Sequence, residues 1–440
     1  MIALRGRIAA QRIEGLDRDV WRIGDTTPSP DRAQMLRAGT IPVPGFGLFL
    51  VAHDAGILVN EPPGMSILLP IELSYVSTGD VIAITPDRTG VRVLWRTASP
   101  VNSVLLTEQC DNFCLMCSQP PRKVDDHWLL EQATELISML DRDTSGLIFT
   151  GGEPTIFGSD FLELLSNCRE QIPDAAIHVL TNGRRFSNQA FAEDYAAVAG
   201  RSVTAGIPIY GSEPSLHDFI VQADGAFNET VNGILNLAAL GSPIELRVVL
   251  QKHTAPWIRE IADFIARNLP FVDQVALMGL EMTGFARSNF NDVWIDPYDY
   301  ADDLAEAARH LDSAGIPTAI YNHQLCLLDR SVWPLAVQSI SDWKQEYEPI
   351  CSGCEVREQC CGFFATGRRQ VSAHIAPVMR TDPLEEAEPN LTIQEEFSYQ
   401  TGASLVGLNS ANGDIANPPL DDMQTTFVMI TRKPESGDPE

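Results

Sequence analysis

The sequence predicts an α/β protein built around a parallel sheet, with a β-rich region before the sheet and a cysteine-rich extension after it. Strand-like apolar runs alternate with amphipathic helices from Ser103 to Gly315. Short apolar runs broken by turn residues come before them, and five of the nine cysteines lie beyond residue 320. These observations divide the chain into residues 1–100, 101–315, 316–370 and 371–440.

The first hundred residues are predicted to form a β-rich accessory domain. The runs IPVPGFGLFLVA, MSILLPIELSYVSTGD and VRVLWRTA contain Gly, Pro and Asp at their breaks, which is typical of short strands. DRTG lies between two β-branched runs and predicts a hairpin in which Gly90 supplies a positive φ. Because no catalytic constellation occurs here, the expected role is scaffolding or substrate docking.

Six strand–helix units follow in residues 101–315. The predicted strands are 103–108, 146–150, 176–181, 202–210, 244–251 and 272–280, and the predicted helices are 128–142, 160–171, 188–199, 227–240, 255–269 and 298–315. Such alternation implies a parallel sheet with right-handed crossovers. Functional groups of parallel β/α sheets gather at the carboxyl ends of the strands, so the loops there are where a site is expected.

Composition excludes several classes of function. The chain carries 59 acidic and 31 basic residues, a formal net charge of -28, which opposes binding to nucleic acid or to an anionic membrane. No apolar run reaches the roughly 18 residues that span a bilayer. The N-terminus lacks the apolar core of a signal peptide, so we expect a cytoplasmic protein whose closely spaced cysteines are metal ligands or redox groups rather than cross-links.

Three cysteines follow the first predicted strand of the parallel sheet. Cys110, Cys114 and Cys117 form a C-x3-C-x2-C pattern on a strand-to-helix loop. No histidine or fourth cysteine lies nearby to complete a closed tetrahedral zinc site. Three thiolates can instead hold a cubane iron–sulfur cluster and leave one iron open to a small molecule.

The next strand ends in the tetrapeptide GGEP. Gly151 and Gly152 allow backbone polar groups to approach a ligand closely, and Glu153 offers an acceptor to an ammonium group. GGEP by itself is also a good turn. Its position one strand after the cysteine triplet favours a binding role.

Two later strands carry further candidates. The third ends in LTNG, where Thr181 and Asn182 are expected either to contact a ligand or to form a plain turn. Arg247 lies inside an otherwise apolar strand, and a buried charge is costly unless it is paired. Arg247 is therefore expected either to bind an anionic group of a ligand or to form a structural ion pair.

A second group of cysteines follows the sixth unit. It consists of one cysteine after a strand-like run and three in a C-x2-C-x5-C pattern, namely Cys326, Cys351, Cys354 and Cys360. Cys361 is the alternative to Cys360. Four thiolates can ligate an iron–sulfur cluster or a zinc ion, and the spacing does not choose between them.

At CDNFCLMC and GGEP the sequence resembles the radical S-adenosylmethionine (SAM) superfamily. The resemblance implies a partial (β/α)6 TIM-like barrel, a [4Fe-4S] cluster on Cys110, Cys114 and Cys117, and SAM on its open iron. It implies that Gly151, Gly152 and Glu153 bind the SAM amino group. It places Thr181 and Asn182 near SAM and Arg247 within reach of the SAM carboxylate.

Several stretches are similar to one branch, the C-type radical SAM maturases of the His-Xaa-Ser repeat peptide system. They are CDNFCLMCSQPPR, VALMGLEMTGFARSNF, IYNHQLCLLD, SISDWKQEYEPICSGC and CGFFATGRR. The likeness implies that residues 316–370 form a twitch- or SPASM-like extension with a second [4Fe-4S] cluster. Expected partners are a precursor peptide with His-Xaa-Ser repeats, a second radical SAM maturase and a flavodoxin- or ferredoxin-type reductant. The modification and the catalytic residues are not specified by the sequence.

Two alternatives remain at the level of sequence. A similar radical SAM enzyme could act on a small molecule or a protein, in cofactor biosynthesis or enzyme activation. A non-catalytic iron–sulfur or zinc scaffold is a lesser alternative. Residues 101–370 carry 37 acidic and 18 basic residues, which favours a neutral or cationic substrate over a polyanion. Residues 371–440 are predicted to be an acidic, partly flexible tail around a short ordered piece, TTFVMITR.

Overall fold

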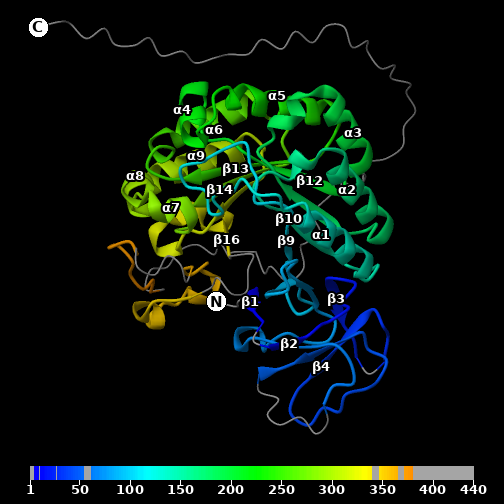
Figure 1. The fold of residues 1–440 in the computed structure, drawn as a ribbon. Coiled ribbons are helices and arrows are strands. Elements are labelled where there is room, and N and C mark those ends of the chain that lie inside the picture. Colours follow the sequence, from blue (N-terminus) through cyan, green and yellow to red (C-terminus); the bar gives the residue numbers. More distant parts are fainter. Residues whose placement is uncertain are drawn as a thin grey trace, which may run out of the picture.

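The structure is a computed structural model that describes residues 4–8, 10–25, 27–53, 61–338, 346–364 and 371–379. It contains two eight-stranded sheets, one in the N-terminal region and one in the α/β region (Figure 1). The predicted ordered piece TTFVMITR and most of the acidic tail lie outside the described residues. Among the described helices, none is long and apolar enough to cross a membrane.

The N-terminal sheet has the strand order β1-β8-β7-β3-β4-β5-β6-β2. Its strands are β1 (Arg5–Arg7), β2 (Ala10–Arg12), β3 (Val20–Ile23), β4 (Arg32–Leu36), β5 (Leu48–Val51), β6 (Ser66–Leu68), β7 (Val81–Ile84) and β8 (Gly90–Trp95). Apolar side chains such as Trp21, Leu48 and Ile82 are buried together in its core. The prediction of a β-rich front region is confirmed.

The predicted hairpin exists, but its positive φ is not at Gly90. β7 and β8 pair antiparallel, and Arg88 takes the left-handed conformation with φ 61°. The Asp87 side chain accepts hydrogen bonds from the backbone and hydroxyl of Thr89, at 3.1 and 2.8 Å, and so stabilises the turn. Gly90 is instead the first residue of β8, where it pairs with Arg7.

The second sheet is parallel and follows chain order from β9 to β16. Its strands are β9 (Ser103–Leu105), β10 (Gly146–Thr150), β11 (Ala176–Leu180), β12 (Val203–Pro208), β13 (Ile244–Leu250), β14 (Gln274–Gly279), β15 (Thr318–Tyr321) and β16 (Ala336–Val337). Within the described residues β9 and β16 are its two edges. The α/β prediction is confirmed, and two strands continue the sheet beyond the six predicted units.

Nine helices occur in the described part of this region. They are α1 (Trp128–Met139), α2 (Ser159–Gln171), α3 (Gln189–Ala199), α4 (Pro214–Val221), α5 (Ala226–Ala239), α6 (Ile258–Asn268), α7 (Gly284–Ser288), α8 (Phe290–Val293) and α9 (Ala301–Ser313). In α6, Ile258, Ile261 and Ile265 recur at helical spacing and are buried. The sequence did not predict α4, α7 or α8, which are short and lie in strand-to-helix connections.

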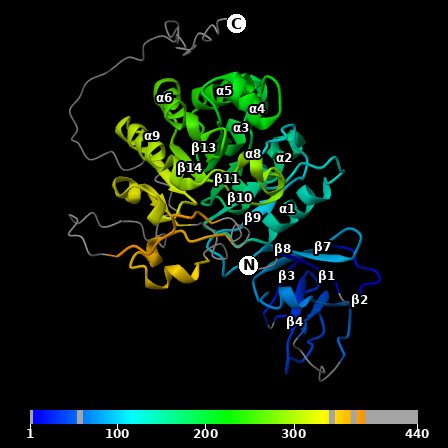
Figure 2. The ribbon, with the colours of Figure 1, turned by 90° about the vertical axis from the view of Figure 1, so that its left-hand side faces the viewer.

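The two faces of the parallel sheet differ in character. One face carries apolar residues such as Phe149, Val179 and Leu246, which pack against the helices in one large core. The other face carries polar side chains, including the buried His178 and Glu245. Because the helices surround the outside of the curved sheet in Figures 1 and 2, the polar face is the inner one.

The N-terminal sheet packs against the β9 end of the α/β region, and both views show it directly below β9 and α1 (Figures 1 and 2). The buried Gln132 of α1 donates to the Ile84 carbonyl at 3.0 Å and accepts from Arg92 at 3.0 Å. Arg22 donates to the Met139 carbonyl at 2.7 Å, at the end of α1. Side-chain hydrogen bonds to backbone carbonyls therefore orient the two sheets relative to each other.

The cysteine-rich segment is built from short turns of 3-10 helix. They are η7 (Leu325–Leu327), η8 (Arg330–Leu335), η9 (Pro349–Gly353) and η10 (Arg357–Gln359). Figure 1 shows this segment, coloured yellow to orange, beside β16, and β16 and β9 are the two edges of the described sheet. η7 and η8 lie between β15 and β16 in the chain, and η9 and η10 follow β16.

Candidate active site

The first three cysteines lie on the loop that leaves β9 at its carboxyl end. This loop has no regular secondary structure around Cys110, Cys114 and Cys117, and a single turn with a 3.0 Å hydrogen bond from Cys117 N to Cys114 O links the last two. Because neighbouring strands are parallel, the loops that follow β10 and β11 emerge at the same edge. We call residues 107–119 the cysteine loop.

Backbone contacts hold the cysteine loop on two sides. Phe113 N and Leu115 N donate to the Val221 and Ile220 carbonyls, both at 2.9 Å, and so satisfy the last carbonyls of α4. On the other side, Phe285 N donates to the Cys117 carbonyl at 2.8 Å.

The turn into α7 also needs a glycine. Gly284 has φ 50°, and a Cβ there would lie 2.4 Å from the Cys117 carbonyl oxygen. The stretch TGFARSNF thus contributes a close backbone approach to the cysteine loop.

A buried carboxylate fixes the start of the cysteine loop. Asp126 accepts from Thr107 Oγ1 at 3.0 Å, from Glu108 N at 2.5 Å and from Gln109 Nε2 at 3.0 Å. Its side chain is 2% exposed. These charge-assisted hydrogen bonds offset the cost of burying the carboxylate.

The GGEP loop lies directly against the cysteine loop. Gly152 N donates to Thr107 O at 2.8 Å, and Glu153 N donates to Gln109 O at 2.7 Å. A Cβ on Gly152 would lie 1.9 Å from Gln109 O and 3.1 Å from the Cβ of Cys110. Only glycine at position 152 permits this approach, so the structure brings the two predicted motifs together.

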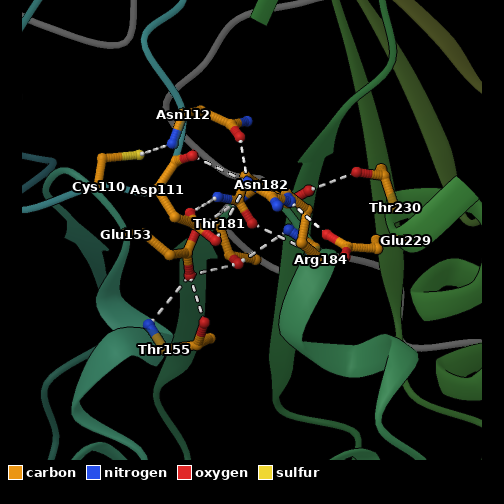
Figure 3. Close-up of polar contacts among 11 residues, drawn as sticks. Cys110, Asp111, Asn112, Glu153, Thr155, Thr181, Asn182, Arg184, Glu229 and Thr230 are labelled. Atoms are coloured by element: carbon orange, nitrogen blue, oxygen red, sulfur yellow. Dashed lines mark hydrogen bonds and ion pairs between the residues drawn. The ribbon is translucent and has the colours of Figure 1, made fainter. Parts of the chain in front are cut away.

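Glu153 is buried, and its carboxylate is already well hydrogen-bonded. Oε1 accepts from Thr155 N at 3.0 Å, Thr155 Oγ1 at 2.6 Å and Thr181 Oγ1 at 2.8 Å, and Oε2 accepts from Asn182 N at 2.6 Å (Figure 3). Burial raises the pKa of Glu153, and these hydrogen bonds act against that rise. Glu153 therefore ties the GGEP loop to the LTNG turn.

The LTNG turn is linked to the cysteine loop as well. Asn182 Nδ2 donates to Asp111 Oδ1 at 2.6 Å, and Thr230 donates to the Asn182 carbonyl at 3.1 Å (Figure 3). Arg184 follows the turn and contacts both Asp111 and Asn112. Sequence reasoning missed Asp111, Asn112 and Arg184, although two of them lie between Cys110 and Cys114.

Arg247 lies on the inner face of the sheet and is paired. Its Nη1 is 2.7 Å from Glu245 Oε1, and Glu245 is 3.5 Å from His178 Nε2. The Arg247 side chain is 22% exposed, whereas Glu245 is 3% exposed. The structural ion pair is thus present, and contact of Arg247 with a ligand carboxylate stays a prediction.

His217 of α4 stabilises the loop that follows β12. Its Nδ1 accepts a hydrogen bond from Tyr210 N at 3.2 Å, and its ring is almost fully buried. Burial lowers the pKa of His217 to about 4. The imidazole is therefore neutral at pH 7, and its acceptor nitrogen is available to the backbone.

The three thiols of the cysteine loop have an environment that disfavours a free thiolate. Burial raises the pKa of Cys110 to about 12, and burial also raises the pKa values of Cys114 and Cys117. Charges on Cys117 and Cys110 raise the pKa of Cys114 further, because the three sulfurs are neighbours. A bound metal cation reverses this balance and deprotonates such thiols.

A cavity of about 600 Å³ opens beside Cys110. Its lining comprises Gln109, Cys110, Asp111, Phe113, Pro121, Arg122, Lys123, Val124, Asp125 and Ile156. That volume is in the range of small-molecule pockets. The predicted ligand contacts at positions 151–153, 181, 182 and 247 are not among its lining residues.

The second group of cysteines also converges. Cys326, Cys351, Cys354 and Cys360 line one small cavity together with mainly apolar residues. Cys361 does not line it, but a hydrogen bond from the Cys361 thiol lowers the pKa of Cys360 to about 6. Within the described chain, the one-plus-three pattern predicted from the sequence is therefore brought to one place.

Residues 104–265 match the model of the radical SAM superfamily. The chain contains a radical SAM domain. This domain spans the cysteine loop, the GGEP loop, the LTNG turn and Arg247. No match was found among curated proteins.

Three solved structures illustrate what the chain is similar to. SuiB of Streptococcus suis is 17% identical, with 52% of this chain and 50% of SuiB covered and a TM-score of 0.38. A radical SAM methyltransferase from Sphaerobacter thermophilus is 16% identical over 56% of this chain and 70% of its own, with a TM-score of 0.37. The FeFe-hydrogenase maturase HydG of Carboxydothermus hydrogenoformans is 11% identical over 51% and 54%, with a TM-score of 0.39. The chain spans about half the length of SuiB.

The radical SAM domain implies a [4Fe-4S] cluster and SAM, and the cysteine loop is compatible with both. Three neighbouring, half-buried thiols would leave an open position on such a cluster, and Gly152 keeps the facing backbone close. Among the described residues, no group of three His, Cys, Asp or Glu side chains is arranged to hold a single metal ion. A cubane cluster spaces its thiolate ligands more widely than a single ion does.

Replacing Gly152 with Ala is expected to displace the cysteine loop, because the new Cβ overlaps Gln109 O. The protein should then retain fewer irons after anaerobic purification, measured by iron analysis against protein concentration. Gly64→Ala is the matched control, since a Cβ there meets only ordinary contacts with Phe49. Full iron content in the Gly152 variant would show that the close approach is not needed.

Acidification is expected to destabilise the protein through His217. The folded state keeps this imidazole neutral down to about pH 4, whereas the unfolded chain binds a proton near pH 6.5. The contribution of His217 to the free energy of unfolding is therefore complete above pH 6.5. It is lost as the pH falls toward 4, and the loss amounts to up to about 3 kcal/mol.

Urea unfolding of wild type and His217→Asn at several pH values measures this effect, because an Asn side-chain oxygen keeps the acceptor without titrating. The Asn variant should lose less stability on acidification than wild type does. His53→Asn, at an exposed histidine, should follow the wild-type curve. Equal pH dependence in the His217 variant and wild type would contradict the assignment.

Proposed function

We propose that this protein is a radical SAM enzyme that modifies a ribosomally synthesised peptide. The observation that carries the first part is the contact between the cysteine loop and the GGEP loop inside the radical SAM domain. An electron carrier or a zinc scaffold needs no open iron and no adjacent ligand loop. The division of the chain at about residues 100, 315 and 370 is part of the same proposal.

Cys110, Cys114 and Cys117 are proposed to hold the cluster at the carboxyl end of β9. When bound, the cluster supplies one electron that cleaves SAM to methionine and a 5′-deoxyadenosyl radical, which abstracts hydrogen from the substrate. The work of the chain is to position these groups and to exclude water. The backbone contacts from α4 and α7 hold the cysteine loop, and with it the three thiols, in place.

Gly151, Gly152, Glu153, Thr181 and Asn182 are proposed to form the SAM-binding edge. Because the Glu153 carboxylate already accepts four hydrogen bonds, we assign the closest contacts with the SAM amino group to the backbone of the two glycines. Glu153 then fixes that backbone relative to the LTNG turn.

Arg247 faces the lumen of the barrel, and we propose that it reaches the SAM carboxylate. Its pairing with Glu245 holds the guanidinium at the inner face of β13.

Cys326, Cys351, Cys354 and Cys360 are proposed to ligate a second [4Fe-4S] cluster. Their convergence on one cavity supports a shared site, and the sequence resemblance favours iron–sulfur over zinc. Cys360 is proposed as the fourth ligand because it lines the cavity and Cys361 does not.

The proposed substrate is a precursor peptide with His-Xaa-Ser repeats. Its support is the resemblance to the C-type maturases together with the acidic character of residues 101–370. A second radical SAM maturase and a flavodoxin- or ferredoxin-type reductant are the proposed partners. A small-molecule or protein substrate is the second candidate, and a peptide gene with His-Xaa-Ser repeats beside this gene would decide for the first.

Replacing Cys114 with Ala is expected to abolish SAM cleavage, because two thiolates do not hold the open cluster. The assay follows 5′-deoxyadenosine after SAM and dithionite are added to anaerobically purified protein. Cys168→Ala is the control, since Cys168 is buried in the helical core and has no proposed role. A wild-type protein that is colourless, contains only zinc and forms no 5′-deoxyadenosine would refute the proposed function. Full cleavage by the Cys114 variant would refute the ligand assignment.

Replacing Cys351 with Ala is expected to remove about four of about eight irons. SAM cleavage should persist, because the first cluster keeps its three thiolates, whereas modification of the substrate should be impaired. Iron analysis and mass spectrometry of a synthetic His-Xaa-Ser peptide measure the two effects. Unchanged iron content would contradict the second cluster, and complete loss of SAM cleavage would contradict the separation of the two sites.

A further inference from the structure

We infer that Arg184 is a positioning residue that fixes the Cys110–Cys114 segment and neutralises Asp111 beside the cluster. This inference rests on the proposed cluster at the cysteine loop. Arg184 begins the 3-10 turn η4 (Arg184–Ser187), directly after the LTNG turn. Arg184 belongs to none of the motifs from which the sequence predicts the site.

The Arg184 side chain contacts the cysteine loop in three ways. Nη1 donates to the Asp111 carbonyl at 2.9 Å and to Asn112 Oδ1 at 2.8 Å, and it lies 3.2 Å from Asp111 Oδ2 (Figure 3). Nε donates to Glu229 of α5 at 2.6 Å. The side chain is 15% exposed, so the guanidinium is held between the cysteine loop and α5 with little freedom.

Asn182 of the LTNG turn also contacts Asp111. It donates to Asp111 Oδ1 at 2.6 Å, and its own Oδ1 accepts from Arg184 N at 3.0 Å. The two oxygens of Asp111 are thus held from one turn, Oδ1 by Asn182 and Oδ2 by Arg184. Asn112 N in turn lies 3.4 Å from Cys110 Sγ, a distance at which a backbone N–H donates to sulfur. The contacts of Arg184 therefore connect, through Asn112, to Cys110, the first proposed cluster ligand.

The charge of Arg184 has a consequence for the cluster. Asp111 is adjacent to Cys110 in the chain, and a negative charge there opposes the addition of an electron to the cluster. Net charge and hydrogen bonds to the sulfurs are two of the factors that set the potential of an iron–sulfur cluster. Without Arg184, the carboxylates of Asp111 and Glu229 lose their shared cation at the cysteine loop. The cluster should then be harder to reduce.

A double-mutant cycle of charge-removing substitutions separates this role from a purely structural one. Arg184→Gln, Asp111→Asn and the double variant are made in the full-length protein, and each is titrated anaerobically while the EPR signal that responds to SAM is followed. At a fixed potential, Arg184→Gln should lower the ratio of reduced to oxidised cluster about tenfold. For a one-electron couple this corresponds to a reduction potential that is lower by about 59 mV. Asp111→Asn should raise the ratio, and the double variant should return to within about twofold of wild type.

Arg185→Gln is the matched control. Arg185 donates to the Thr155 and Ile156 carbonyls and packs on Phe191, away from Asp111, so its loss should leave the ratio unchanged. Arg184→Lys keeps the charge and should retain a potential near wild type, even where Arg184→Gln fails to hold iron.

The outcomes separate the two proposals. A wild-type protein with no SAM-responsive signal refutes the proposed function and this role with it. If wild type gives the signal, three results refute the role of Arg184 alone. They are an Arg184→Gln variant whose reduction potential does not shift, an iron-loaded Arg184→Lys variant whose potential is clearly lower than that of wild type, and a double variant whose potential is not restored.

Discussion

The site depends on holding an irregular loop of three half-buried thiols in one place. A loop without regular structure cannot satisfy its own backbone groups, and these must be paired where water is excluded. Here the carbonyls that end α4 accept from the cysteine loop, α7 donates to it, and the GGEP loop bonds its first residues. Each of these elements follows a different strand, so the loop is determined by the barrel as a whole.

Buried carboxylates do much of this positioning. Asp126 holds the start of the cysteine loop, and Glu153 joins the GGEP loop to the LTNG turn. Each accepts several hydrogen bonds, which offsets the cost of burial and makes the surrounding geometry specific. A buried acidic residue can therefore set the geometry of a loop by accepting hydrogen bonds from it, as Asp126 and Glu153 do.

The two cysteine groups are held by different architecture. The first lies on one loop at a strand end, where an open position can face a ligand. The second joins Cys326 of η7 and Cys351 of η9 to Cys354 and Cys360, which directly follow η9 and η10, and together they line one small cavity. Three half-buried thiols on one loop fit the proposed SAM-binding cluster, and four thiols from separate turns fit the proposed auxiliary cluster.

The sequence by itself determined the alternation of strands and helices, the β-rich character of the N-terminal region, and the two groups of cysteines, because these are local patterns. It also indicated that the backbone can approach another group closely at Gly151 and Gly152, although GGEP by itself is equally a turn signal. It misplaced the positive φ of the hairpin at Gly90, because a side-chain hydrogen bond from Thr89 to Asp87 permits that conformation at Arg88 instead. Only the tertiary structure decided that Glu153 accepts hydrogen bonds from Thr181 and Asn182, and that Arg184 meets Asp111 across 73 positions of the chain. Such pairings depend on which strand ends are neighbours in the sheet, and no local spacing in the sequence encodes that distance.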